Sequence, residues 1–236
     1  MNNTIQTIRQ QLLAASDEKT KLSGLRFFKE KVELYGVASA MVGKIAKANF
    51  DKIKGESKES ILVMCEQLWQ SGYMEESFIA CNWSYELHKK FVEEDLVWME
   101  KWVDQYLNNW ASCDTLCNHT VGSYIEMFPE KILVLKKWAT SPNRWMRRAA
   151  AVSLIVPARK GLFLKDVFEI ADILLLDTDD MVQKGYGWML KSATKCYERE
   201  VFDYVMAHKK VMPRTALRYA IEKMPKELKV VAMAKP

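Results

Sequence analysis

Apolar residues recur every three to four positions along most of this chain, and turn-forming residues separate these stretches. Such spacing is typical of amphipathic helices, because residues three and four apart lie on one helical face. The one β-branched run, over 152–156, continues a helical pattern up to Pro157. The pattern predicts an all-α chain with helices over 4–14, 23–34, 58–69, 75–91, 96–105, 113–126, 131–139, 144–154, 167–175, 180–194, 201–208 and 213–223.

Several of these helices carry their own start signals. Ser23 is a candidate N-cap of the second predicted helix. Ser141 is placed to cap a later helix, with Pro142 in its first turn. The acidic run over 177–180 precedes another helix and matches the positive end of its dipole. The segment 225–236 carries no comparable signal, and we expect it to fray.

Polar residues recur with a long and nearly constant period. Asp114, Arg148, Lys184 and Arg218 follow one another at steps of 34, 36 and 34 residues, each on a separate predicted helix. A period in this range is typical of stacked helix pairs. If the register holds, these side chains line one continuous face, and three cations with a carboxylate and nearby tryptophans suit a polyanion such as DNA.

Composition supports a single globular domain over residues 1–236. The chain is 49% hydrophobic and 28% charged, and no Pro/Gly/Ser-rich linker interrupts it. The net charge of +5 is uneven: residues 191–236 hold 11 Lys/Arg against 5 Asp/Glu, and residues 142–160 hold five cations and no acid. Such islands indicate either phosphate binding or a solvated helix face, and charge alone leaves both readings open.

The cysteines and the absence of several known motifs argue against some classes of protein. The five cysteines form no disulfide framework, so we expect a cytoplasmic protein, and no stretch approaches the roughly 20 apolar residues of a membrane span. Cys113, Cys117 and His119 lie close in sequence but lack a fourth zinc ligand, and small buried side chains are the alternative reading. No phosphate-binding loop or dinucleotide fingerprint appears, so we expect neither a metal nor a nucleotide cofactor.

Two tryptophans stand one helical turn from a periodic charged residue. Trp110 precedes Asp114 by four residues, and Lys184 precedes Trp188 by four. A carboxylate stabilises an oxocarbenium-like sugar and orients water, an aromatic face attracts cations, and an arginine such as Arg148 binds phosphate. These groups would suit cleavage of the N-glycosidic bond of a cationic alkylated purine. Burial of both tryptophans in a core is the alternative, and the chemistry is one option among several.

Four strings of the chain form a pattern in their order and spacing: Trp110-x-x-x-Asp114, Asn143-Arg-Trp-Met-Arg-Arg148-Ala-Ala, Val182-Gln-Lys-Gly-Tyr-Gly-Trp188 and Met212-Pro-Arg-Thr-Ala-Leu-Arg-Tyr-Ala-Ile-Glu222. In these strings the chain resembles the bacterial HEAT-like-repeat alkylpurine DNA glycosylases of the AlkD type, over most of its length. The resemblance implies an α-α superhelix, a curved solenoid with a basic concave groove for duplex DNA, and a groove that wraps DNA suggests a monomer. It also implies excision of positively charged N3- and N7-alkylpurines without a deep base-flipping pocket.

Roles follow from the same resemblance. It makes Asp114 the catalytic carboxylate, Arg148 a backbone-phosphate contact, and Trp110 and Trp188 the aromatic contacts to the lesion nucleotide's sugar and backbone. The residues expected to bind DNA are Phe27, Arg144, Arg147, Arg148, Lys184, Arg214 and Arg218.

One position departs from the family pattern. Phe27 stands where the family has tyrosine, so a ring remains but its hydroxyl is absent. Two alternatives therefore stay open: a non-catalytic repeat protein that binds distorted or branched DNA, and a protein-interaction solenoid, the general use of stacked helices.

Overall fold

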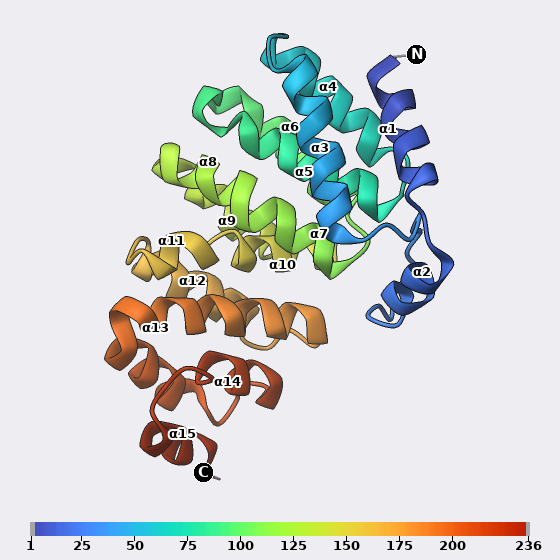
Figure 1. The fold of residues 1–236 in the computed structure, drawn as a ribbon. Helices are drawn as coiled ribbons and strands as arrows, with labels where there is room; N and C mark the ends of the chain where they lie inside the picture. Colours follow the sequence, from blue (N-terminus) through green and yellow to red (C-terminus); the bar gives the residue numbers. More distant parts are fainter. Residues whose placement is uncertain (1–2, 235–236) are drawn as a thin grey trace. The chain divides into compact units, whose positions relative to one another are not determined.

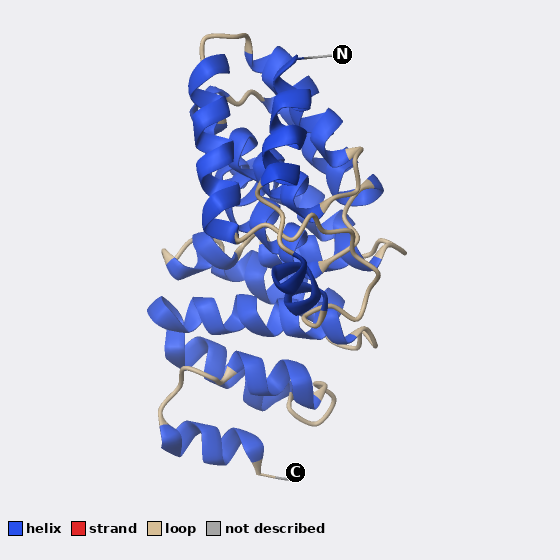
Figure 2. Cartoon of the chain, turned by 45° about the vertical axis from the view of Figure 1, so that its right-hand side comes forward, coloured by secondary structure: helices blue, strands red, loops and turns tan. Residues whose placement is uncertain are grey.

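The computed structural model of the protein describes residues 3–234, and every regular element in that range is a helix. Figures 1 and 2 show the helices joined by loops along the chain. An isolated parallel bridge between Glu33 and Tyr73 is the β-type pairing found in the described range. The predicted all-α class is confirmed.

The chain divides into two compact units, the first ending at Leu116 and the second beginning at Cys117. The prediction of one domain over 1–236 stays a prediction. In the first unit, the α-helices are α1 (Asn3–Ala14), α2 (Glu18–Leu25), α3 (Ser39–Ile53), α4 (Lys58–Trp69), α5 (Met74–Glu86), α6 (Leu96–Gln105) and α7 (Trp110–Thr115), with 3₁₀ turns at His88–Lys90 and Glu93–Asp95.

Helix α5 is the centre of the first unit and packs on α3, α4 and α7. Its Trp83 is fully buried, and the indole Nε1 donates to the Ala46 carbonyl oxygen at 2.9 Å. Trp102 of α6 is also fully buried and donates to a Glu66 carboxylate oxygen at 2.6 Å. A buried indole N–H needs such a partner, so these tryptophans are structural.

The second predicted helix, over 23–34, is wrong in both its bounds and its cap. Helix α2 begins at Glu18, five residues before the predicted start at residue 23, because Asp17 and not Ser23 caps it. The Asp17 carboxylate accepts hydrogen bonds from the backbone N–H and the hydroxyl of Thr20, at 2.7 and 2.6 Å. An acidic N-cap satisfies an orphan donor and meets the positive end of the helix.

A buried carboxylate explains why no helix continues toward residue 34. Glu75 of α5 is 3% exposed and accepts backbone N–H groups of Tyr35, Gly36 and Val37 at 3.1, 2.8 and 3.1 Å. Gly36 has a φ of +89°, a conformation that favours glycine. These donors gain partners outside a helix, so no helix forms over 35–37.

Helix α3 is absent from the predicted elements although its buried face has helical spacing. Val42, Ile45, Ala46, Asn49 and Ile53 are buried. The asparagine interrupts the apolar pattern, and its amide nitrogen finds carbonyl partners inside the unit. A buried polar residue interrupts the apolar pattern of the sequence. It destabilises the folded state little when its hydrogen-bonding groups have partners.

The second unit begins within a π-helical segment, Leu116–Val121, that lies between α7 and α8 in the sequence. Its helices are α8 (Gly122–Met127), α9 (Ile132–Trp138), α10 (Arg144–Val152), α11 (Ile155–Arg159), α12 (Leu164–Leu174), α13 (Asp180–His208), α14 (Arg214–Ala220) and α15 (Lys226–Met233), with a 3₁₀ turn at Pro129–Lys131. Helix α13 packs on α10, α11, α12 and α14, and so forms the centre of this unit.

Three helix starts in this unit test the predicted caps. Asn143, not Ser141, caps α10, since its side-chain oxygen accepts the Trp145 N–H at 2.9 Å. Pro213 is the N-cap of α14 and not a helical residue. The acidic start of α13 is confirmed: Asp179 accepts backbone N–H groups from the first turn, and Asp180 opens the helix.

The two predicted helices over 180–194 and 201–208 both lie within the range of α13, on either side of a kink. The chain bends at Tyr197, where φ is −136° and ψ is 51°. The tail also differs from its prediction, because α15 follows Pro225 where fraying is expected. Lys209 donates to the carbonyl oxygen of Val231 at 3.0 Å, and Ala232 is fully buried, so the last helix has partners within the unit.

Glycines inside α13 mark a close approach of another helix. A Cβ on Gly187 would lie 2.7 Å from the carbonyl oxygen of Ala216 in α14, so only glycine fits there. A Cβ on Gly185 would lie 3.4 Å from Arg148 Cγ, an ordinary contact. Of the two glycines, Gly187 is the one that admits a neighbouring backbone.

Candidate functional site

Trp110, the first residue of α7, is held in place by the turn that follows α2. The Asn109 side chain caps α7 by accepting the Ser112 N–H at 2.9 Å. The Trp110 indole Nε1 donates to the Phe27 carbonyl oxygen at 3.4 Å, and its ring stacks on Phe28 with centroids 5.5 Å apart. The indole is therefore oriented while part of it stays accessible to solvent.

An apolar hollow of about 340 Å³ opens beside this indole. Phe27, which lines the hollow, is 72% exposed. Isolated large apolar side chains are normal on a protein surface, but an exposed ring that lines a hollow has room for a flat partner. The aromatic residues that line the hollow are Phe27, Phe28, Phe78 and Trp110.

Asp114 lies one turn after Trp110 on the same helix, and it is half-buried. Its neighbour Cys113 is fully buried and sets the inward face of α7. The four-residue spacing brings Asp114 and Trp110 to one side of α7, as the sequence predicted for these two residues. A carboxylate and an indole thus share an accessible helical face.

Arg148 of α10 is far less accessible than its predicted role suggests. The residue is 4% exposed, and its guanidinium donates to the Met181 carbonyl oxygen in the first turn of α13. The side chain passes Gly185, which leaves room for it. In the structure Arg148 therefore joins α10 to α13, and its contact with phosphate stays a prediction.

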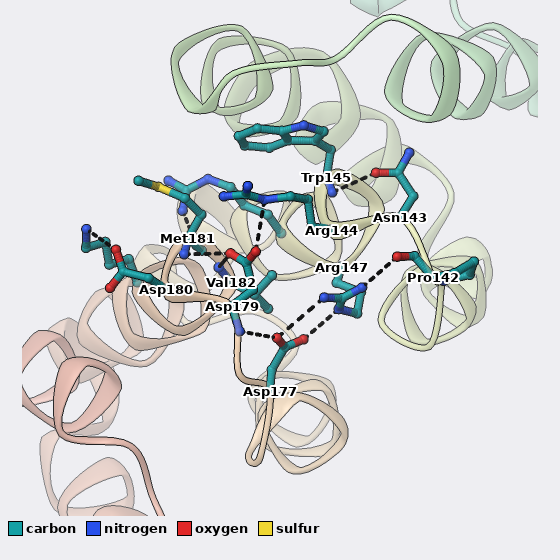
Figure 3. Close-up of polar contacts among 12 residues, drawn as sticks. Pro142, Asn143, Arg144, Trp145, Arg147, Asp177, Asp179, Asp180, Met181 and Val182 are labelled. Carbon is teal, nitrogen blue, oxygen red and sulfur yellow. Dashed lines mark hydrogen bonds and ion pairs between the residues drawn. The ribbon is translucent and has the colours of Figure 1, made fainter. Parts of the chain in front are cut away.

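The neighbouring cations Arg144 and Arg147 face the acidic run that begins α13 (Figure 3). Arg147 Nε lies 2.6 Å from an Asp177 carboxylate oxygen, and its Nη1 donates to the Ser141 and Pro142 carbonyl oxygens at 3.0 Å. These partners hold the Arg147 guanidinium against the α12–α13 turn.

Arg144 and Lys184 are paired with the same acidic run. Arg144 Nε lies 3.0 Å from an Asp179 carboxylate oxygen, while its guanidinium stands 4.8 Å from the Trp145 ring centroid. Lys184 Nζ lies 2.7 Å from Asp180. Two of the five cations in the 142–160 island, Arg144 and Arg147, are thus paired with acidic residues that precede α13.

Trp188 of α13 is partly exposed and lies beside Lys191, a residue outside the predicted site. Lys191 Nζ stands 6.0 Å from the Trp188 ring centroid and 5.5 Å from that of Tyr219 in α14. It also contacts Glu222 at 2.8 Å, and this hydrogen bond lowers the pKa of the Glu222 carboxyl. The i, i+3 spacing of Trp188 and Lys191 is the signal that could have revealed the contact.

Arg214 and Arg218 of α14 are both exposed. Arg214 Nη2 donates to the Met233 carbonyl oxygen at 3.3 Å, which ties it to α15. Because these arginines project from a short helix into solvent, they are open to an anionic partner.

Two cysteines that stand close together in the sequence lie in the interior. Cys113 and Cys117 are each fully buried. Within the described range, His, Cys, Asp and Glu side chains form no group of three or more that could hold a metal ion. No helix among residues 3–234 has both the length and the apolar character that crossing a membrane requires.

Comparison with known proteins identifies a family whose model matches the chain. A family model described as DNA alkylation repair enzyme matches residues 8–224. No curated protein sequence matches the chain. Solved structures with the same fold include a predicted DNA alkylation repair enzyme from Enterococcus faecalis, with a TM-score of 0.80 at 17% identity, covering 89% of this chain and 97% of that chain. Another is smu.31 from Streptococcus mutans UA159, with a TM-score of 0.59 at 17% identity, covering 96% and 98%.

Proposed function

The chain belongs to the DNA alkylation repair enzyme family, and on that premise we propose that it hydrolyses the N-glycosidic bond of cationic N3- and N7-alkylpurines in duplex DNA. The products would be the free alkylated base and an abasic site. A cationic purine is already a good leaving group, so the reaction needs little acid catalysis. It needs stabilisation of the positive charge that develops on the sugar, and a positioned water.

Asp114 is our candidate for both tasks. An ionised carboxylate beside the anomeric carbon lowers the energy of the oxocarbenium-like transition state, and it accepts a hydrogen bond from the attacking water. The supporting observation is the shared face of α7, on which Asp114 is half-buried one turn from Trp110. Partial burial strengthens the electrostatic effect and leaves the carboxylate within reach of a ligand.

The aromatic residues would contact the sugar and the backbone. An indole face attracts polarised C–H groups and cations. Trp110 is oriented in advance by Phe27 and Phe28, so it loses little side-chain freedom on binding. We assign Trp188 the same role, with Lys191 holding one side of its ring.

The basic residues would bind the backbone phosphates. Arg214 and Arg218 are exposed, and Arg144, Arg147 and Lys184 would exchange an acidic partner for a phosphate. Arg148 would act on a phosphate next to the lesion, for which a guanidinium offers two parallel donors. Arg148 is the most buried of the four residues that we propose to act at the lesion, the others being Asp114, Trp110 and Trp188.

Release of 7-methylguanine from methylated duplex DNA tests this proposal. Wild-type protein is expected to release the base, and Asp114→Asn to do so about 10²–10³-fold more slowly, the scale of losing one group that stabilises transition-state charge. Wild-type protein that binds duplex DNA and releases no base would instead support a non-catalytic DNA-binding protein. Binding that is insensitive to salt would point to a protein-interaction role.

A further inference from the structure

A basic hollow of about 550 Å³ lies in the second unit beside Trp188, and apart from that indole none of its residues belongs to the predicted site. We call it the Lys195 hollow. The two cationic islands of the sequence meet in it, since Arg159 comes from the first and the lysines from the second. Its lining includes Arg159, Trp188, Lys191, Lys195, Glu198 and Lys223.

Specific contacts hold the walls of this hollow. Arg159 is the last residue of α11, and its backbone carbonyl accepts a hydrogen bond from the Cys196 thiol at 3.6 Å. The next residue of α13, Tyr197, donates its hydroxyl hydrogen to the Gly161 carbonyl oxygen at 2.9 Å. The end of α11 is thus fixed to α13 at its bend, which keeps the Arg159 and Lys195 backbones in a set relation.

The charges in the hollow are not balanced. Lys191 is paired with Glu222, and Lys223 lies at 3.9 Å from the same carboxylate. Arg159 and Lys195 are exposed, and neither forms an ion pair with an acidic residue of the described chain. Binding an anion there would not require breaking an existing pair, unlike at Arg144, which is held by an aspartate.

Helical spacing connects this charge with the predicted site. Trp188 follows Lys184 by four residues and precedes Lys195 by seven, so all three lie on one face of α13. A polyanion that contacts Lys184 and the Trp188 indole would meet Lys195 two turns further along the same helix.

We propose that the Lys195 hollow binds backbone phosphates of DNA through Arg159 and Lys195, beside the nucleotide that Trp188 contacts. The identification of that nucleotide as an alkylated one rests on the proposed function. Lys191, paired and only 16% exposed in its side chain, positions the Trp188 indole and is not itself a phosphate contact. The hollow extends the DNA contact beyond every residue that the sequence predicted.

The test measures the affinity for a short unmodified duplex as a function of salt concentration. The slope of log K against log salt is negative for phosphate binding. In the double variant Arg159→Ala/Lys195→Ala its magnitude should decrease by about 2, because each lost phosphate contact removes about 0.9. The double variant Lys165→Ala/Lys210→Ala makes the same charge change at exposed positions outside the hollow and should keep the wild-type slope. The exchange Arg159→Lys/Lys195→Arg conserves charge and should also keep it.

An unchanged slope in the alanine variant, or an equal fall in the control, would overturn the inference, as would wild-type protein that binds no duplex. Thermal unfolding of each variant excludes a loss of fold as the cause. The assay does not depend on base release. Protein that binds through the hollow but releases no base would remove the proposed function alone, and protein that releases base with an unchanged slope would remove the hollow alone.

Discussion

The indole Nε1 of Trp110 donates its hydrogen bond to the backbone carbonyl of Phe27, so the Phe27 side chain takes no part in that contact. The ring that stacks on the indole belongs to Phe28. The two adjacent phenylalanines therefore have separable roles: one supports the tryptophan, and the other presents an exposed ring.

We predict that Phe28→Ala lowers the free energy of unfolding by about 1–3 kcal/mol, through lost burial and the lost aromatic pair. Phe27→Ala should change it by no more than about 0.5 kcal/mol, because the ring is 72% exposed. Chemical denaturation of both variants provides the measurement. Equal losses in the two variants would contradict the assignment.

The glycines of α13 give a matched pair of variants. Gly187→Ala should lower stability by about 1–3 kcal/mol, because its new methyl group would overlap the α14 backbone at Ala216. Gly185→Ala meets Arg148 at an ordinary contact distance and should be neutral or stabilising by up to about 1 kcal/mol, the helix-propensity gain. Thermal unfolding distinguishes them, and a harmless Gly187→Ala would show that α13 and α14 are not as close as described.

The start of α13 depends on Asp179, which caps the helix and pairs with Arg144. Asp179→Ala should cost about 0.5–2 kcal/mol through loss of the cap. Asp179→Asn keeps a capping oxygen and loses the charge, so it should cost less. If denaturation shows equal costs, the ion pair and not the cap is the main contribution of this residue.

Glu66 should make the first unit sensitive to acid. Burial alone would raise the pKa of this carboxyl, but hydrogen bonds from Lys101, Tyr106 and Trp102 outweigh it and hold the pKa below its ordinary value. A depressed pKa in the folded state means that the stabilisation is complete above the unfolded-state pKa of about 4.3 and is lost as the pH falls through the folded pKa.

The matching variant is Glu66→Gln, which cannot titrate. It should be less stable than wild type at neutral pH, and the difference in unfolding free energy should shrink as the pH falls below about 4.3. Denaturant titrations across this pH range provide the measurement. A difference that stays constant with pH would show that the charge of Glu66 adds nothing to stability.

The sequence predicts the elements that depend on local pattern. The helices over 58–69 and 96–105 have the predicted bounds, and the acidic cap of α13 was readable because an aspartate before a helix has a local meaning. The four periodic residues fall on α7, α10, α13 and α14, one on each. Spacing along one chain segment determines these features.

Local sequence spacing does not predict the contacts between segments that are distant in the chain. Arg147 and Asp177 are thirty residues apart, so the sequence could count their charges but not pair them. In the same way Glu75 binds the backbone at 35–37 and removes a helix that propensity favours. The burial of Arg148 also depends on packing within the second unit, as does the hollow that Arg159 and Lys195 both line.

The rate of 7-methylguanine release from methylated duplex DNA under single-turnover conditions tests the central claim most directly. We predict release by wild-type protein, a loss of about 10²–10³-fold in Asp114→Asn with the DNA affinity retained, and an unchanged rate in the control Asp203→Asn, which removes an exposed carboxylate paired with Arg199. Wild-type protein that releases no base, or Asp114→Asn that releases it at the wild-type rate, would contradict the account.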